Sequence, residues 1–174
     1  MQASLGDALL KDGNVRGAAS HFAEAVRLYP GYAEGEYGLG VALALQDRFG
    51  EAEAHFRQAL LLRPKYADAE FNLGNAITRQ GRAAEAIPYL RQASRDEPES
   101  PAAHAALGTA LMNVGNLEQA VGELSQAVRL DPNFAAAHYN LAAVLAVQGR
   151  RAEASEHFER AFALEPGLRR QAQP

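Results

Sequence analysis

A regular spacing of prolines constrains the fold of this chain more than any other feature. Five prolines follow one another at intervals of 34 residues, namely Pro30, Pro64, Pro98, Pro132 and Pro166. A fixed period of this length indicates one small structural element that is copied along the chain and stacked on its neighbours. A stack of this kind has long exposed surfaces, so the period favours a protein that holds other molecules.

Small and apolar residues recur with the same period, in columns that define the repeats. Alanine recurs at Ala18, Ala52, Ala86, Ala120 and Ala154, and again at Ala25, Ala59, Ala93, Ala127 and Ala161. Leucine recurs at Leu5, Leu39, Leu73, Leu107 and Leu141, each followed by a small residue at Gly6, Gly40, Gly74, Gly108 and Ala142. A large apolar residue recurs at Phe22, Phe56, Leu90, Leu124 and Phe158. In this register the repeats are 1–32, 33–66, 67–100, 101–134 and 135–168, with a tail at 169–174.

Each repeat is predicted to contain two helices. Within 33–66 the apolar residues are three or four positions apart, which predicts helices at about 33–46 and 50–63. Between the helices stands Gly13, Asp47, Gly81, Gly115 or Gly149, which suits the left-handed conformation that ends a helix. The recurring proline is expected to end the second helix, because its ring cannot continue the hydrogen-bond ladder. Gly40 and its equivalents should let the two helices approach closely, with Phe56 filling the hollow between Ala52 and Ala59.

The column set Leu-Gly, Ala, Phe, Ala and Pro on this period resembles the tetratricopeptide repeat family, over about 168 of the 174 residues. The resemblance implies an all-α fold, a right-handed α-α superhelix of antiparallel helix pairs with a concave groove lined by the first helices. It also implies non-catalytic binding of a protein or peptide partner. The chain departs from the family in one column, where an aromatic residue often stands early in the first helix. Here that column holds Gln2, Glu36, Glu70, His104 and His138.

Helical geometry places a set of side chains from the first helices on the predicted concave side, and these form our candidate peptide-binding groove. They are Tyr37, Val41, Phe71, Asn72, Asn75, Arg79, Thr109, Met112, Asn113, Tyr139 and Asn140, with Glu34 and Asp68 on the same face. Asn72 and Asn75 are suited to grip a peptide backbone, because an amide both donates and accepts hydrogen bonds. Alternatively, the aromatic residues only pack between neighbouring first helices and the asparagines only face solvent. Tyr32, Tyr66 and Phe134 directly follow the prolines, and we expect them to close the junctions between repeats.

Two binding modes known in the family can be compared with this sequence. The clamp for the acidic C-termini of heat-shock chaperones needs paired Lys, Arg and Asn side chains. Only Asn75 matches it, since Phe71, Ala102 and Ala106 occupy the neighbouring columns. The asparagine ladder of O-linked N-acetylglucosamine transferases is retained at Asn72 and Asn140 but interrupted at Ser4, Gly38 and Ala106. The resemblance therefore implies neither binding mode in full.

Composition and spacing weigh against other classes of function. The formal charge is −4, and basic and acidic residues are interleaved, so the basic stripe of a nucleic-acid binder is missing. No stretch approaches the ~20 apolar residues that cross a bilayer, so we expect no membrane insertion. The histidines fall in two columns whose neighbouring members should lie ~8–10 Å apart, too far to share a zinc ion. No nucleophile–base arrangement or phosphate loop is found, so we expect a protein that is not an enzyme. We also expect no metal and no cofactor. We expect a cytoplasmic location.

Three hypotheses of function remain open. The chain is an adaptor that captures a peptide or helix, or it is the substrate-recruiting arm of a larger enzyme such as a bacterial glycosyltransferase. Alternatively, it self-associates through uncapped ends, because stacks of this kind normally end in a polar capping element. The chain starts at the third position of a repeat and continues only six residues past the last one, so we expect a fragment or a bare end. We also predict a weak point near 84–101, where Pro88 interrupts a helix and Asp96 replaces a leucine.

Overall fold

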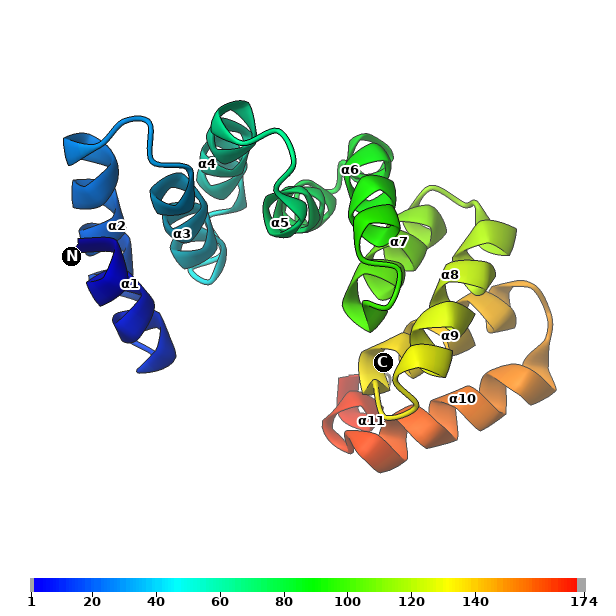
Figure 1. Cartoon of the computed structure of the whole chain (residues 1–174). Coiled ribbons are helices and arrows are strands. Elements are labelled where there is room, and N and C mark those ends of the chain that lie inside the picture. Colours follow the sequence, from blue (N-terminus) through cyan, green and yellow to red (C-terminus); the bar gives the residue numbers. More distant parts are fainter. Residues whose placement is uncertain (1, 172–174) are drawn as a thin grey trace. The chain divides into compact units, whose positions relative to one another are not determined.

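Residues 2–171 are described by a computed structural model, and they contain helices and no strand (Figure 1). The predicted all-α fold is therefore confirmed. The ten long helices are α1 (Gln2–Lys11), α2 (Val15–Leu28), α3 (Ala33–Ala44), α4 (Phe49–Leu62), α5 (Ala67–Arg79), α6 (Ala83–Asp96), α7 (Pro101–Asn113), α8 (Leu117–Leu130), α9 (Ala135–Val147) and α10 (Arg151–Leu164). Odd-numbered helices are the first helices of the repeats, and even-numbered helices are the second helices.

The helices are grouped in two compact units, which meet between Gln92 and Ala93 inside α6. In the first unit, α3 packs on α4 and also contacts α1 and α5. In the second unit, α7 packs on α8, α9 packs on α10, and α7 contacts α9. Within each unit the first helices therefore touch one another in sequence and form a continuous layer.

The turns inside the hairpins confirm the predicted left-handed residues. Within residues 2–171 a positive φ occurs only at the five predicted positions, with 75° at Gly13, 58° at Asp47, 79° at Gly81, 78° at Gly115 and 77° at Gly149. The amide of the following residue then reaches back to the helix. At the second hairpin, Arg48 N donates to the Leu43 carbonyl at 3.1 Å. This bond satisfies a carbonyl that the helix end leaves without a partner.

Glycine allows close packing between the two helices of a hairpin, as predicted. A Cβ atom added to Gly40 would lie 2.6 Å from the Phe56 ring, and one added to Gly74 would lie 2.5 Å from Leu90 Cγ. Neither distance is tolerated without a shift, so both positions exclude larger residues. The facing alanine columns are buried as predicted, with Ala52, Ala86 and Ala120 fully covered.

In four of the hairpins, the polar residue that replaces the family's early aromatic is paired across the hairpin. His21 Nδ1 donates to Gln2 Oε1, His55 Nδ1 donates to Glu36 Oε2, and His104 Nδ1 donates to Glu123 Oε2, each at 2.7 Å. In the last hairpin the Nδ1 atoms of His138 and His157 are 2.9 Å apart. Every pair joins residues 19 positions apart, one from each helix. The pairs replace apolar packing by hydrogen bonds inside the hairpin, which explains why the departure from the family is tolerated.

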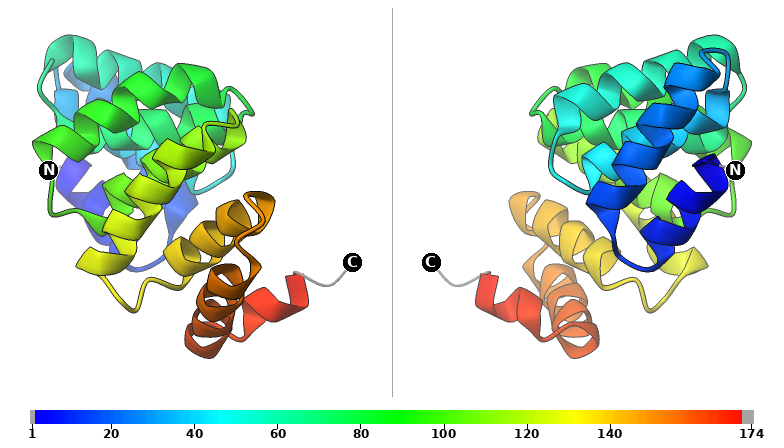
Figure 2. Two further views of the ribbon diagram at one scale, coloured as in Figure 1. Left: turned by 90° about the vertical axis from the view of Figure 1, so that its right-hand side faces the viewer. Right: turned by 90° about the vertical axis from the view of Figure 1, so that its left-hand side faces the viewer.

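The last helix that the structure describes is short, α11 (Gly167–Gln171), and it contacts α10 (Figure 2). The predicted tail at 169–174 begins inside this helix, and its residues 172–174 lie outside the described residues, as does Met1 at the start of the first repeat. Between residues 2 and 171, no helix is both long enough and apolar enough to cross a membrane. In the same range, no three acidic, histidine or cysteine side chains gather as a metal site would require.

Candidate functional site

The first-helix layer of the first unit carries a hollow of about 430 Å³, which we call the tyrosine hollow. It includes two of the predicted groove residues, Tyr37 and Val41. The complete lining is Ala3, Asp7, Leu10, Phe22, Tyr32, Glu34, Tyr37, Gly38, Val41 and Tyr66. Three of the lining residues are tyrosines and two are carboxylates, so the hollow offers both aromatic faces and negative charge.

A difference between two neighbouring repeats explains the open space. In the second repeat, the ring of Tyr66 packs on the ring of Tyr37, with centroids 4.9 Å apart. One period earlier, Tyr32 stands in the place of Tyr66, but Ala3 stands in the place of Tyr37. The missing ring leaves the face of Tyr32 uncovered toward α1. The tyrosine hollow is thus a junction between repeats that lacks one of its two aromatic residues.

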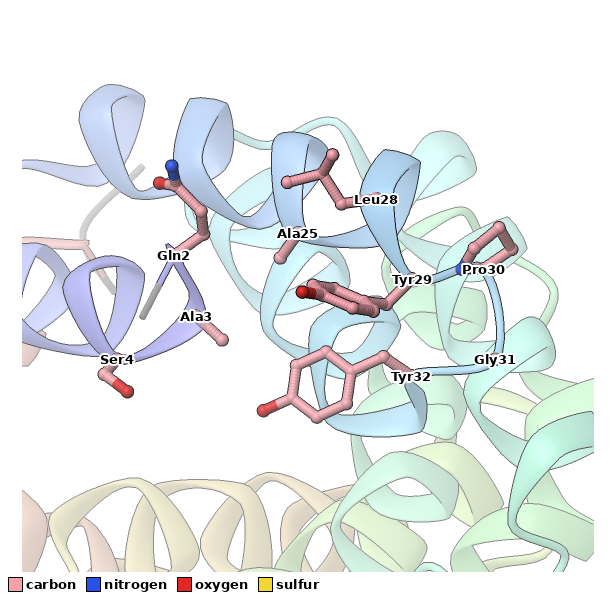
Figure 3. Close-up of a pocket in the computed structure, with 9 residues that line it drawn as sticks. All are labelled: Gln2, Ala3, Ser4, Ala25, Leu28, Tyr29, Pro30, Gly31 and Tyr32. Carbon is pink, nitrogen blue, oxygen red and sulfur yellow. The ribbon is translucent and has the colours of Figure 1, made fainter.

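A second hollow of about 690 Å³ adjoins the first and shares Ala3 and Tyr32 with it (Figure 3). We call it the N-terminal hollow, and it is lined by Gln2, Ala3, Ser4, Ala25, Leu28, Tyr29, Pro30, Gly31 and Tyr32. In Figure 3 the rings of Tyr29 and Tyr32 extend from the loop toward the first turn of α1. Tyr29 is 68% exposed and Leu28 is 46% exposed. Large apolar side chains this exposed in a hollow are typical of a binding surface.

Tyr37 is held in place from several sides. Its ring packs on Phe56 with centroids 6.0 Å apart, and its hydroxyl accepts a hydrogen bond from Asn72 Nδ2 at 3.1 Å. Burial raises the pKa of Tyr37 to about 12, and the nearby Asp68 carboxylate adds to the rise. Tyr66 also has a raised pKa, mainly through burial and then through Asp68. Both phenols therefore keep their protons at neutral pH and remain hydrogen-bond donors.

The carboxylates around the tyrosine hollow differ in whether they are paired. Glu34 forms an ion pair with Arg63, whose guanidinium lies 4.8 Å from the centre of the Tyr66 ring. Asp7 and Asp68 are exposed, and their carboxylates form no ion pair or hydrogen bond with any residue that the structure describes. Two carboxylates near the tyrosine rings are thus without an ion-pair partner among residues 2–171.

The other predicted residues of the first unit lie on α5. Asn72 Nδ2 donates to the Asp68 carbonyl at 2.8 Å as well as to Tyr37, so its amide hydrogens already connect α5 with itself and with α3. Arg79 lies 4.7 Å from the Phe49 ring centre and 3.6 Å from Asp47, at the turn end of the hairpins. Phe71 and Asn75 are partly buried. The structure places these residues on the first-helix layer but outside the lining of the tyrosine hollow.

In the second unit the predicted residues also take part in internal contacts. Asn140 Nδ2 donates to Thr109 Oγ1 at 2.9 Å and so connects α9 with α7. Tyr139 packs against the second helix α10, where its ring contacts Phe158 and Phe162 at 5.4 and 6.4 Å. Met112 is partly buried and Asn113 is exposed. A groove that runs through the first helices of both units stays a prediction.

Sequence reasoning missed several residues that line the two hollows. Tyr29 stands in a column that otherwise holds Arg63, Glu97, Asp131 and Glu165, so an aromatic residue in a charged column was the available signal. Ala3 was the second signal, because its column holds Tyr37, Phe71 and Tyr139 in other repeats. Asp7 and Leu10 stand one or more periods before the predicted groove residues Val41 and Met112, so the repeat register itself was the signal for both.

Family models match along the chain. Models described as tetratricopeptide repeat match residues 4–65 and 46–101, residues 78–129 and residues 135–168, and a model described as TPR repeat matches residues 110–149. The matched segments overlap or adjoin, and one of the models alone spans more than half of the chain.

Solved structures with the same fold cover nearly the whole chain. MamA 41-end from Desulfovibrio magneticus RS-1 is 25% identical with a TM-score of 0.85, covering 95% of this chain and 94% of that one. YrrB, whose structure is described as a TPR protein with an unusual peptide-binding site, is 24% identical with a TM-score of 0.79. That match covers 95% of this chain and 85% of YrrB. A comparison with curated protein sequences finds no match.

Proposed function

This chain belongs to the tetratricopeptide repeat family, and we propose that it is a non-catalytic scaffold that binds a peptide or helix of a partner protein over the first helices of its first unit and the loop that precedes α3. The observation that carries this proposal is the pair of adjoining hollows in the first unit, which meet at Ala3 and Tyr32. Two hollows side by side suit a linear segment that places one side chain in each.

The chemistry of the walls supports a peptide as the ligand. Tyrosine offers a large rigid surface together with a hydroxyl, and it loses little conformational entropy when it is covered. Tyr29, Tyr32 and Tyr37 supply such surfaces along one face of the first unit. The volumes of the two hollows fall in the range of about 300–1,000 Å³ that is common for ligand sites.

The similar structures agree with a binding function without naming a ligand. YrrB is described as having a peptide-binding site, but at 24% identity its likeness to this chain concerns the fold alone. The proposal for this chain therefore depends on its own residues. Peptide binding by these residues requires neither a metal nor a reactive nucleophile.

The proposal can be tested by closing the hollows without disturbing the fold. Random linear peptides displayed on phage are selected on the intact chain, and the affinity of the best peptides is measured by fluorescence anisotropy. Ala3→Tyr should then weaken binding by at least about tenfold, because the new ring fills the space of a central anchor side chain. A tyrosine, Tyr37, already stands at the equivalent position of the next repeat and packs on Tyr66, so the variant should remain folded.

Ala23→Tyr is the matched control, since it adds the same ring at an exposed position of α2 that lines neither hollow. It should leave the affinity unchanged. If Ala3→Tyr binds the peptides as well as the unmodified chain does, this site is wrong. If no peptide is selected at all, peptide binding itself is wrong.

A further inference from the structure

The charges around the tyrosine hollow are unbalanced in one direction. Asp7 lines the hollow, Glu34 lines it as well, and Asp68 lies close enough to affect the ionisation of both Tyr37 and Tyr66. Arg63 pairs with Glu34, and Lys11, one turn after Asp7 on α1, forms no ion pair with Asp7 within the described residues. The remaining carboxylates therefore repel an acidic ligand and attract a basic one.

One cation of the chain, Arg63, is already bound at the lining of the tyrosine hollow. The Arg63 guanidinium lies 4.8 Å from the centre of the Tyr66 ring while it pairs with Glu34. A cation within about 6 Å of an aromatic centre is attracted by the electrons of the ring face. The combination of one ring and one carboxylate thus already holds one guanidinium, and a second such combination remains unused.

That second combination consists of the Tyr32 ring, the part of the Tyr37 ring that lines the hollow, and the carboxylate of Asp7. All three residues line the same hollow. Ala3 and Gly38 are the small residues of the lining, and a Cβ atom at Gly38 would lie 2.4 Å from the Phe22 ring, so that position stays small. The wall is therefore open, aromatic and negatively charged at once.

From this arrangement we infer that the partner segment carries an arginine or lysine side chain that enters the tyrosine hollow, between Asp7 and the rings of Tyr32 and Tyr37. The inference rests on the proposed peptide-binding function and specifies the chemistry of its ligand. The adjoining N-terminal hollow, with exposed Leu28 and Tyr29, then receives a neighbouring apolar side chain of the same segment. A basic residue next to a large apolar one is the expected recognition pattern.

The peptides selected on the intact chain provide the first test. They should be enriched in arginine or lysine beside a large apolar residue. Replacing the basic residue of a selected peptide by the uncharged citrulline or by glutamine should weaken binding by about tenfold, as expected for a charge-assisted contact. Binding should also weaken as salt is raised, because the charges on both sides are exposed to solvent.

Variants of the protein provide the second test. Asp7→Asn should weaken the binding of basic peptides several-fold and should weaken their salt dependence, and Asp68→Asn should act in the same direction. Asp12→Asn is the matched control, an exposed aspartate of the same repeat that does not line the hollow. The Asp7→Arg variant should no longer bind the selected basic peptides. It should instead bind versions of those peptides in which glutamate replaces the arginine.

The possible outcomes separate this inference from the function on which it rests. Suppose that Ala3→Tyr abolishes binding, but the selected peptides lack basic residues and Asp7→Asn binds them normally. The inference is then overturned and the proposed function stands. If Ala3→Tyr has no effect, the proposed site itself fails, whatever residues the peptides contain.

Discussion

Asp47 adopts the left-handed conformation that glycine adopts in the other four hairpin turns, with φ at 58°. An L-residue with a side chain pays roughly 1–2 kcal/mol in that region, although aspartate less than most. Asp47→Gly should therefore raise the free energy of unfolding by about 0.5–1 kcal/mol in a urea titration. The ion pair lost with Arg79 spans 3.6 Å between exposed side chains, so it offsets little of the gain.

The reverse substitution is the control for that prediction. Gly149 has φ at 77° and nothing near its missing side chain, so Gly149→Asp tests the backbone conformation alone. It should lower the free energy of unfolding. A stability of Asp47→Gly below that of the unmodified chain would mean that the side chain of Asp47 contributes more than its backbone strain costs.

Ala86 tests the closeness of packing at a single buried position. It is fully covered on α6, in the alanine column that faces the first helix of the hairpin. Ala86→Leu should lower the free energy of unfolding by about 1–3 kcal/mol, because the added atoms have no space. Ala84→Leu adds the same atoms at an exposed position of the same helix and should change stability little. A thermal melt of Ala86→Leu that overlays that of Ala84→Leu would contradict the prediction.

At the scale of helices, the last hairpin differs from the others because its polar pair consists of two histidines, His138 and His157. His138 Nε2 donates to the Pro132 carbonyl at 3.2 Å, so its Nδ1 accepts from His157 Nδ1 at 2.9 Å. The pKa of His138 is lowered mainly by burial, and also by the positive charges of His157 and Arg160. The pair therefore requires a neutral His138, and protonation would place two donors against each other.

This pair predicts acid sensitivity of the second unit. Because the pKa of His138 is lower in the folded state, its neutral form contributes stability above the ordinary value of 6.5, and that stability is lost as the pH falls below it. Histidine titrates between about pH 7 and pH 5. In urea titrations over that range, the free energy of unfolding of His138→Gln should fall less than that of the unmodified chain. His21→Gln, the control in the first hairpin, should leave the pH dependence of the second unit unchanged. Equal slopes for His138→Gln and the unmodified chain would contradict this.

The helices and their crossings could be predicted because each depends on local rules repeated five times. Gly40 facing Phe56 and the left-handed Asp47 follow from backbone sterics and the period. The hollows could not be predicted in the same way, because they depend on what a neighbouring repeat lacks. Ala3 matters only because Tyr32 has no ring to pack on, and Asp7 matters only because it borders the resulting space.

At the scale of the whole molecule, α6 is the helix inside which the two compact units meet, between Gln92 and Ala93. Pro88 lies one turn before that boundary and beyond the first turn of α6. It has no amide hydrogen, so the carbonyl of Ala84 has no helical donor from it. The predicted weak point at 84–101 contains this proline and the boundary, and the weakness itself stays a prediction.

Hydrogen exchange can decide whether α6 opens more easily than its neighbours. Amides of 84–101 should exchange faster than those of α4 and α8, because one bond fewer holds the helix and local opening starts where bonds are missing. Pro88→Ala restores that bond and should slow the exchange, with a gain in stability of about 1 kcal/mol. Pro101→Ala is the matched control, since Pro101 is the first residue of α7, where the missing amide costs nothing. Uniform protection across all helices, or equal effects of the two substitutions, would show that α6 is as firmly held as the rest.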